Sequence, residues 1–354
     1  MTIEPEIGQL PPASAPDRAV AADHARAILA SARVRCEPVL HASVDSLPDP
    51  LRRMAGYHFG WWDPNGTPWR TQSGKALRPA LAMSTAAAVS AVIPDVVGAA
   101  AAVELVHNFS LIHDDVIDGD RTRHGRATVW AVWGKADAVL LGDALHALAG
   151  RVLVQYVRAA AVGAAIDRLE SAVIEMCHGQ YDDCRLDEYS AAGVGDYERM
   201  AMGKTGALMG CACALGALCA GAGEATVAAM DRFGRELGLA FQYTDDLIGI
   251  WGDPQVTGKP ISDLVRHKKS LPVVVALRSG TAAARELTQL YESDVPMTAG
   301  TAVVTATLIE AAGGRRITQD HADQRVDAAI AALPDRSAAT DLIALARLVA
   351  HRDR

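Results

Sequence analysis

The chain has 354 residues, enough for one large domain or two ordinary domains with a sizeable core. Half of the residues are hydrophobic, only 5% are aromatic, and alanine is abundant, which favours close-packed helices over sheets. The net charge of −8 argues against a general nucleic-acid binder. We therefore expect an all-α protein that does not bind nucleic acid.

The compartment is predicted from the cysteines and the apolar runs. None of the six cysteines forms a paired CxxC zinc pattern, and three lie in the apolar run CACALGALCA. The chain does not open with the basic, apolar and small-residue layout of a signal peptide. Charged residues interrupt its apolar runs too often for a membrane span. We expect a cytoplasmic protein without stable membrane insertion.

The N-terminal stretch predicts a tail followed by helices. Residues 1–17 carry four prolines and little hydrophobic pattern, so we expect a mobile tail before a single domain over residues 18–354. Apolar residues at helical spacing then predict one helix after Asp17 and another over residues 50–60.

Two cations follow a turn at the start of the next predicted helix. Lys75 and Arg78 are three residues apart, so we expect them on one helical face. Free backbone N–H groups and the helix dipole favour an anion there. Two basic residues at a helix start are also common on ordinary surfaces, so this pair alone leaves both interpretations open.

Three aspartates end a long apolar stretch over residues 96–117. Asp114 and Asp118 are four apart and therefore share a helical face, and Asp115 lies beside them. Bringing like charges together at an apolar helix end is unfavourable without a compensating cation. Oxygen ligands favour magnesium, which shares its coordination with waters and substrate phosphates. The alternative is a solvated helix end whose aspartates cap the following loop.

The loop after these aspartates holds three arginines, Arg121, Arg123 and Arg126. Carboxylates followed by guanidinium groups indicate a joint site for magnesium and diphosphate, or else salt bridges across the loop. Further helices are predicted over residues 136–157 and 166–179.

The same design recurs farther along the chain. Asp245 and Asp246 end another apolar helix, and a loop with Lys259 and the basic run 266–269 follows. Lys204 and Thr205 introduce a third apolar stretch. Residues 271–354 predict more helices and no further chemical motif. We expect the two aspartate sites to face each other across a cavity in one helical domain.

From about residue 50 to the C-terminus, ordered motifs resemble the trans-isoprenyl diphosphate synthases of the polyprenyl synthetase family. They are GKxxRP (74–79), ELxHxxSLIHDDxxD (104–118), GDxL (142–145), GQxxD (179–183), KT (204–205), FQxxDD (241–246), GK (258–259) and DxxxxK (263–268). The set is most similar to geranylgeranyl diphosphate synthases. The resemblance implies a helical bundle around a deep apolar cavity, a homodimer, and isopentenyl and allylic diphosphates as substrates.

The resemblance also implies roles for the matching residues, with three magnesium ions in each site. Asp114, Asp118 and Asp245 would bind magnesium, supported by Asp115 and Asp246. The allylic diphosphate would be bound by Arg123, Lys204, Lys259 and Lys268. Isopentenyl diphosphate would be bound by Lys75, Arg78, His107 and the residue at position 124, His124. Thr205 and Gln242 would lie near the developing allylic cation.

These residue types suit ionisation of a diphosphate. Magnesium and cationic side chains stabilise negative charge on departing pyrophosphate. The double bond of isopentenyl diphosphate then attacks the allylic cation, and proton loss completes a product five carbons longer. In the family, the departing pyrophosphate takes that proton.

Product length is expected to depend on residues before the first aspartates. Phe109 lies five residues and Ser110 four residues before Asp114, and these are expected to form the cavity floor. One bulky and one small residue there resemble the pattern of enzymes that make the C20 product. Phe109 as ordinary core packing is the alternative.

Two departures from the family pattern leave other functions open. His124 stands where a second consecutive arginine is usual, and histidine lacks the guanidinium fork. Gly249 replaces the usual last aspartate of the second motif, which removes a magnesium ligand or water-holder. A class I terpene cyclase, an irregular prenyl-coupling enzyme and a non-catalytic modulatory subunit are therefore alternatives to chain elongation.

Overall fold

Helices make up nearly all of the regular structure in this computed structural model, which describes residues 15–69, 74–90, 96–186, 192–252, 262–293 and 295–350. The N-terminal half contains α1 (Ala15–Asp45), α2 (Leu51–Phe59), α3 (Leu77–Val89), α4 (Val97–Ile117), β1 (Thr122–Arg123), β2 (Arg126–Ala127), α5 (Val129–Trp133), α6 (Lys135–Tyr156) and α7 (Ala159–Leu186). The remainder contains α8 (Val194–Ala201), the π-helical segment η1 (Met202–Gly206), α9 (Ala207–Cys219), α10 (Glu224–Trp251), α12 (Ser262–Val265), α13 (Leu271–Leu277), α14 (Ala282–Tyr291), α15 (Ala299–Ala311), α16 (Gly314–Ala332) and α17 (Thr340–Ala350). The predicted all-α class is confirmed.

The expected helices are present, with some different boundaries. The helix predicted over residues 50–60 is α2, and the one over residues 136–157 is α6. The helix predicted for residues 166–179 is longer, because α7 continues to Leu186 and carries the whole GQxxD motif. Most of the predicted tail, residues 1–14, lies outside the described residues, and the first helix begins at Ala15.

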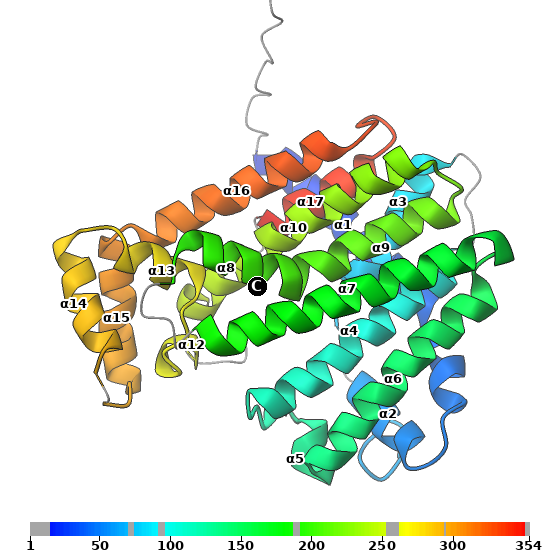
Figure 1. Cartoon of the computed structure of the whole chain (residues 1–354), viewed down its shortest axis with the longest axis horizontal. Helices are drawn as coiled ribbons and strands as arrows, with labels where there is room; N and C mark the ends of the chain where they lie inside the picture. Colours follow the sequence, from blue (N-terminus) through cyan, green and yellow to red (C-terminus); the bar gives the residue numbers. More distant parts are fainter. Residues whose placement is uncertain are drawn as a thin grey trace, which may run out of the picture.

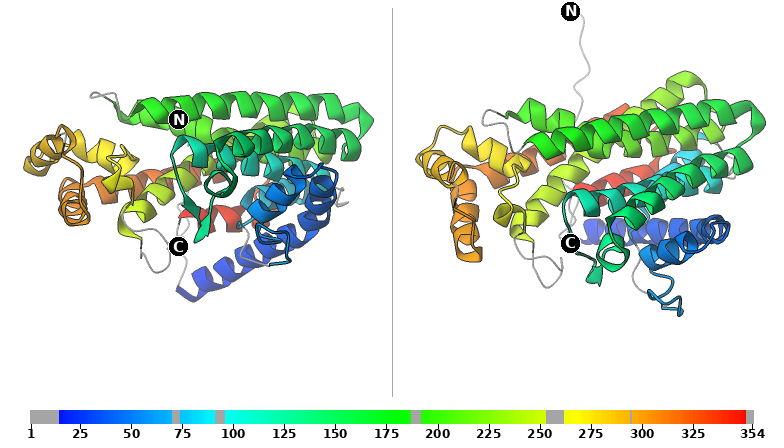
Figure 2. Two further views of the ribbon diagram at one scale, coloured as in Figure 1. Left: turned by 90° about the horizontal axis from the view of Figure 1, so that it is seen from below. Right: turned by 60° about the horizontal axis from the view of Figure 1, so that its bottom comes forward.

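Alanine-rich helices form the centre of the molecule. Helix α9 packs against α3, α7 and α10, and α4 packs along α6 (Figure 1). Alanines on α4 and α9 are fully buried, among them Ala100, Ala101, Ala212 and Ala214. Small side chains let helix axes approach closely, so several long helices can surround one helix. Figure 2 shows α6 and α7 running along each other on one side of the bundle.

One long helical stretch of the chain is strongly apolar. The continuous helix Val194–Cys219 is long and apolar enough to cross a membrane, but 78% of its most apolar part is buried inside the protein. It includes η1, where the chain makes a wider turn at Lys204 and Thr205. Burial on this scale is typical of a core helix in a globular domain.

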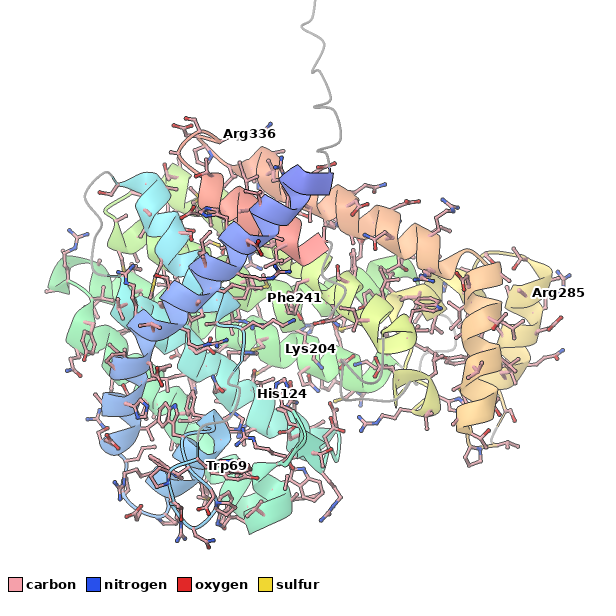
Figure 3. All side chains as sticks on the ribbon, turned by 180° about the vertical axis from the view of Figure 1, so that it is seen from behind. Trp69, His124, Lys204, Phe241, Arg285 and Arg336 are labelled. Carbon is pink, nitrogen blue, oxygen red and sulfur yellow. The ribbon has the colours of Figure 1, made fainter. Side chains whose placement is uncertain are left out.

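A smaller group of helices, α12 to α15, extends from one end of the bundle (Figure 1). A separate apolar cluster that includes Ile250, Leu264, Val273 and Ile309 holds these helices on the end of α10. In Figure 3, Arg285 lies at the far end of this group, whereas Lys204 and His124 lie near the middle of the molecule. Lys204 and His124 therefore belong to the main bundle, whereas Lys268 lies between α12 and α13 of the smaller group.

Candidate active site

The first aspartates lie at the C-terminal end of helix α4. Asp118 is the C-cap, and its backbone N–H donates to the carbonyl of Asp114 at 2.8 Å. Gly119 follows with φ of 69°, a left-handed conformation that glycine adopts readily and that ends the helix. Asp114 and Asp118 are thus one turn apart at a helix end, as the sequence predicts.

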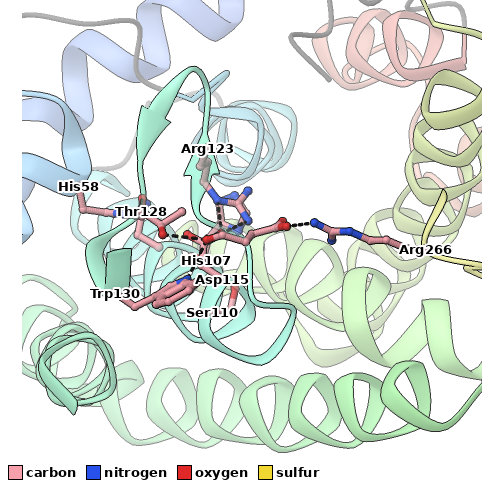
Figure 4. A network of polar contacts seen from close by, with 10 residues as sticks. His58, His107, Ser110, Asp115, Arg123, Thr128, Trp130 and Arg266 are labelled. Atoms are coloured by element: carbon pink, nitrogen blue, oxygen red, sulfur yellow. Dashed lines mark hydrogen bonds and ion pairs between the residues drawn. The ribbon is translucent and has the colours of Figure 1, made fainter. Parts of the chain in front are cut away.

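Asp115 faces the protein interior and binds Arg123. Its side chain is 3% exposed, and its Oδ1 accepts hydrogen bonds from Arg123 Nε at 3.0 Å and Nη2 at 2.8 Å (Figure 4). Strands β1 and β2 form a hairpin around His124 and Gly125, both in the left-handed region that a two-residue hairpin turn favours. The hairpin therefore places Arg123 over the end of α4.

The other two arginines of this loop have different partners. Arg121 lies over the ring of Trp130, with 5.1 Å between its Cζ and the ring centroid. Arg126 donates to the backbone carbonyls of Tyr57 at 2.8 Å and His58 at 3.1 Å. Arg126 thus holds the hairpin against α2.

The second aspartate pair lies within α10, and its second member is also directed inward. Asp246 is 4% exposed and accepts hydrogen bonds from Tyr197 Oη at 2.5 Å, the Leu271 N–H at 2.7 Å and Gln242 Nε2 at 3.1 Å. Burial raises the pKa of Asp246 to about 6 even though these donors favour the ionised carboxylate. Asp246 therefore connects α10 to α8 and α13, while Asp245 is more exposed.

Two lysines meet on a third carboxylate, Asp183 of α7. Lys204 Nζ lies 2.5 Å and Lys268 Nζ 3.5 Å from Asp183 Oδ2. Burial alone would raise the pKa of Asp183, but the two ammonium groups outweigh it and hold the pKa below its ordinary value. Burial would lower the pKa of Lys268, but nearby carboxylates, Asp183 first among them, raise it. Both cations are therefore held in place beside the first aspartates.

The segment η1 sets the position of Lys204 and Thr205. A Cβ on Gly179 would lie 2.1 Å from the Lys204 backbone nitrogen, so only glycine lets α7 approach η1 this closely. Thr205 Oγ1 donates to Gln242 Oε1 at 2.8 Å. Single π-helical turns often occur at functional sites. The structure thus brings Lys204, Thr205 and Gln242 together.

A second basic region lies on the other side of Asp115. His107 is enclosed, and burial, followed by the charges of Arg78 and Arg123, lowers its pKa well below the ordinary value. His107 is therefore neutral at physiological pH. It lines a cavity together with Arg123, His124 and His58.

Lys75 occupies a different place from the one predicted. Helix α3 begins at Leu77, and its N-cap residue Ala76 has φ of 53°. Lys75 precedes the helix and is exposed. The prediction that Lys75 and Arg78 share a helical face is therefore wrong, because the left-handed turn at Ala76 separates them. Lys259 lies outside the described residues.

The space next to Gly249 is occupied by a carboxylate. A Cβ built on Gly249 would lie 2.4 Å from Asp263 Oδ2, the side chain that α12 brings against α10. The position where the second motif lacks its last aspartate therefore has a carboxylate beside it. Asp263 is the first residue of the DxxxxK motif, and nothing in the local sequence indicates that it lies beside Gly249.

An apolar cavity of about 340 Å³ lies between α4 and α7. Phe109, Ser110 and Asp114 line it from α4, and Met176 and Cys177 line it from α7. Lys204 also borders it. The cavity thus runs from the charged groups down the two helices, and both residues predicted for its floor lie in its wall.

Two further side chains were not singled out from the sequence. Asp183 belongs to the GQxxD motif, so its motif membership was an available signal. His58 lies in α2, and its Nε2 lies 3.0 Å from Asn108 Oδ1. Since the Asn108 amide donates to the Glu104 carbonyl at 2.8 Å, its oxygen accepts the His58 proton.

The carboxylates at the charged end of the apolar cavity, Asp114 and its neighbour Asp118, suit magnesium. Burial raises the pKa of Asp114 to about 6 against the attraction of Lys204, and repulsion from Asp118 adds to the rise. A bound divalent cation would relieve both effects. Within the described ranges, no three carboxylate, histidine or cysteine side chains form a metal site by themselves. Magnesium usually takes few protein ligands and completes its shell with waters and phosphates.

We predict that Asp114→Asn stabilises the ligand-free protein. Burial penalises the charged carboxylate, whose pKa is raised from 3.8 to about 6. At about 1.4 kcal/mol per pKa unit, the free energy of unfolding at pH 7.5 should rise by roughly 1–3 kcal/mol. As the pH falls through the folded value of about 6 toward the unfolded value of 3.8, the folded carboxyl becomes neutral, so most of the gain should be lost by pH 4.

Denaturant titrations at pH 4 and pH 7.5 measure this difference. The same variant should lose the thermal stabilisation that magnesium with inorganic pyrophosphate gives the parent protein. A lower free energy of unfolding at pH 7.5 would show that Asp114 is a stabilising structural group and contradict the prediction.

Comparisons with known proteins agree with the motifs. The chain matches the polyprenyl synthetase family over residues 69–306. It is 52% identical over 335 residues to a geranylgeranyl diphosphate synthase of Mycobacterium tuberculosis, covering 94% of this chain and 96% of the relative. A (2E,6E)-farnesyl diphosphate synthase of the same organism is 41% identical over 321 residues, covering 88% and 89%.

Superposition on solved structures agrees with the sequence comparisons. A polyprenyl synthetase from Streptomyces coelicolor A3(2) superposes with a TM-score of 0.85 at 44% identity, covering 91% of this chain and 98% of that protein. A geranylgeranyl pyrophosphate synthetase from Pyrococcus horikoshii superposes with a TM-score of 0.80 at 26% identity, covering 93% and 98%. The chain is a prenyltransferase that belongs to the polyprenyl synthetase family.

Proposed function

We propose that this enzyme condenses isopentenyl diphosphate with an allylic diphosphate to give trans-geranylgeranyl diphosphate. The observation that carries the proposal is the meeting of Lys204 and Lys268 at Asp183, beside Asp114 and above an apolar cavity. A charged mouth suits a diphosphate, and an apolar cavity suits its growing hydrocarbon tail.

Lys204 and Lys268 act on the allylic diphosphate in this proposal. In the free enzyme Asp183 compensates both ammonium charges. An arriving diphosphate offers stronger acceptors, so the lysines bind it and stabilise the charge that develops as the C–O bond breaks. Arg123 contributes from the hairpin, and Lys259 is assigned the same role from its motif alone.

Asp114, Asp118 and Asp245 would hold three magnesium ions against the diphosphate. Magnesium bound there supplies Lewis-acid stabilisation of the leaving group. Asp115 and Asp246 act differently, because Arg123 occupies an oxygen of Asp115 and protein donors occupy both oxygens of Asp246. We therefore assign Asp115 and Asp246 to support, and Asp246 to no direct metal contact.

Asp263 is proposed to replace the aspartate missing at Gly249. Its Oδ2 lies 2.4 Å from the place where a Cβ at Gly249 would stand. It also contributes to the raised pKa of Lys268. A carboxylate here would hold magnesium-bound waters and keep Lys268 charged.

Moving this carboxylate between the two positions tests the assignment. Asp263→Ala should lower kcat/KM by about ten-fold or more and raise the magnesium concentration needed for half-maximal rate. Gly249→Asp alone should also impair the enzyme, because its side chain would overlap Asp263. The double variant should recover most of the activity, and a double variant no better than Asp263→Ala would contradict the proposal.

Isopentenyl diphosphate is assigned to the basic region around His107. Arg78 and Arg123 supply charge and His107 supplies a neutral hydrogen-bonding group. Lys75, which is exposed just before α3, is assigned to the same diphosphate from its motif alone. His124 contributes from the hairpin turn, as a weaker partner than arginine. Thr205 and Gln242 lie near the developing allylic cation, and the departing pyrophosphate takes the proton after alkene attack.

The C20 product length rests on the cavity wall and on the relatives. Phe109 is 7% exposed and lines the cavity, with Ser110 beside it. The relative with 52% identity is named geranylgeranyl diphosphate synthase, whereas the farnesyl diphosphate synthase is 41% identical.

One assay tests elongation against its alternatives. Purified enzyme with magnesium receives dimethylallyl, geranyl, farnesyl or geranylgeranyl diphosphate, each with and without isopentenyl diphosphate. We expect C20 diphosphate from the first three primers, only when isopentenyl diphosphate is present. A hydrocarbon or alcohol formed from geranylgeranyl diphosphate alone would indicate a cyclase, and no turnover of any substrate would indicate a modulatory subunit.

We further propose a cytoplasmic homodimer. Val139, Leu140, Val154 and Ile174 expose large apolar surfaces on α6 and α7, which suits contact with a second copy. All six cysteines are free thiols, as a reducing compartment requires. Recovery of a dimer from the membrane-free fraction of a lysate, measured by analytical ultracentrifugation, is expected; a monomer or membrane-bound enzyme would contradict it.

A further inference from the structure

The ring of Phe109 is enclosed by two histidines. The His113 ring meets it edge-on, with 5.2 Å between centroids. The His146 ring stacks on it, with 5.3 Å between centroids and 25° between planes. Phe109 and His113 belong to α4, whereas His146 belongs to α6. The three rings therefore form a layer that links two helices beside the cavity.

Each histidine ring is held through its Nε2 atom by a contact with another helix. His113 Nε2 donates to the Val139 carbonyl of α6 at 3.0 Å. A Cβ on Gly142 would lie 2.1 Å from the same nitrogen, so the absence of a side chain there makes room for the ring. His146 Nε2 lies 2.8 Å from Glu170 Oε2 on α7. Helices α4, α6 and α7 are thus tied together around Phe109.

His146 is not among the residues that line the cavity, whereas Phe109 is. His146 therefore has no direct contact with a hydrocarbon tail in the cavity or with the diphosphate. Its contact is with the face of the Phe109 ring, and Glu170 fixes the imidazole in that position. Without the stacked ring, Phe109 would gain room to rotate away from the cavity.

We propose that His146, held by Glu170, is a positioning residue that keeps Phe109 in place as the cavity floor and so limits the product to C20. This inference rests on the elongation reaction proposed above. It assigns the length limit to a unit built from three helices, in which Phe109 and His113 line the cavity and His146 and Glu170 do not.

The experiment measures products from farnesyl diphosphate with excess isopentenyl diphosphate and magnesium, by liquid chromatography and mass spectrometry. His146→Ala should raise the ratio of C25 and longer products to C20 by about ten-fold or more. The rate of the first condensation should stay within about two-fold of the parent rate, because His146 does not contact the reacting groups.

Two substitutions separate ring stacking from a general structural effect. His146→Phe keeps an aromatic ring against Phe109 and should restore the C20 product. Glu170→Ala keeps the imidazole but removes its anchor, and should give an intermediate distribution. His24→Ala is the matched control, since His24 pairs with Asp341 at 2.8 Å on the exposed faces of α1 and α17. It should leave the product unchanged.

A double variant tests whether His146 acts through Phe109. Phe109→Ala alone should lengthen the product, because it removes the floor. Adding His146→Ala should lengthen it no further, since the side chain on which His146 acts is already gone. Additive lengthening would overturn the positioning role. Circular dichroism melting and sedimentation of every variant show whether the fold and oligomeric state are kept.

Other outcomes separate this inference from the proposed reaction. A His146→Ala enzyme that is folded, turns over at the parent rate and still stops at C20 would overturn the inference alone. So would equal lengthening in His146→Phe and His146→Ala. If His146→Ala does not fold, Glu170→Ala decides, and an unchanged product from that variant counts against the inference. A parent enzyme that does not elongate farnesyl diphosphate would overturn the proposed reaction and the inference together.

Discussion

Burial of Asp114 and its repulsion by Asp118, at the C-terminal end of α4, form the constraint on which the site depends. Asp114 and Asp118 lie one turn apart, and burial with this repulsion makes ionisation of Asp114 unfavourable. Lys204 and Lys268 provide compensating charge, but both are also engaged by Asp183. In the free enzyme, carboxylates therefore compensate the positive charges of both lysines. Magnesium and a diphosphate, arriving together, add both kinds of charge to this arrangement.

The paired aspartates divide into two kinds by direction. Asp115 and Asp246 face inward, and each joins its helix to another element through hydrogen bonds: Asp115 to the β1–β2 hairpin, Asp246 to α8 and the start of α13. Asp114 and Asp245 are more exposed. The adjacent residues of each pair point in different directions because successive positions on a helix are rotated by about 100°. One aspartate of each pair can therefore hold the fold while its neighbour is available for metal.

The fold also explains how the two departures from the family pattern are accommodated. Asp263 lies against Gly249, so a carboxylate reaches the end of the second motif from α12. His124 forms the turn of the hairpin that places Arg123, and the cavity beside it is also lined by His58 and His107. A basic, hydrogen-bonding wall is thus kept with one guanidinium fewer. Both arrangements suit the chain elongation proposed here and do not require a different reaction.

The all-α class, most helix positions and the family can be predicted from the sequence alone. Apolar periodicity and alanine content report local structure, and the ordered motifs predict that Asp114, Lys204, Asp245 and Lys268 belong to one site. The left-handed turn at Ala76, which separates Lys75 from α3, could not be read from composition, because alanine is ordinarily a helix former.

Which distant side chains meet depends on how the helices pack in three dimensions. Asp183 lies between two lysines from separate segments, Asp263 fills the space beside Gly249, and His146 stacks on Phe109. None of these contacts follows from spacing along one helix, since each joins elements whose relative placement depends on packing of the whole bundle. Local sequence patterns report which face of a helix is buried. Which residue of another helix it meets is settled only when all the helices are packed together.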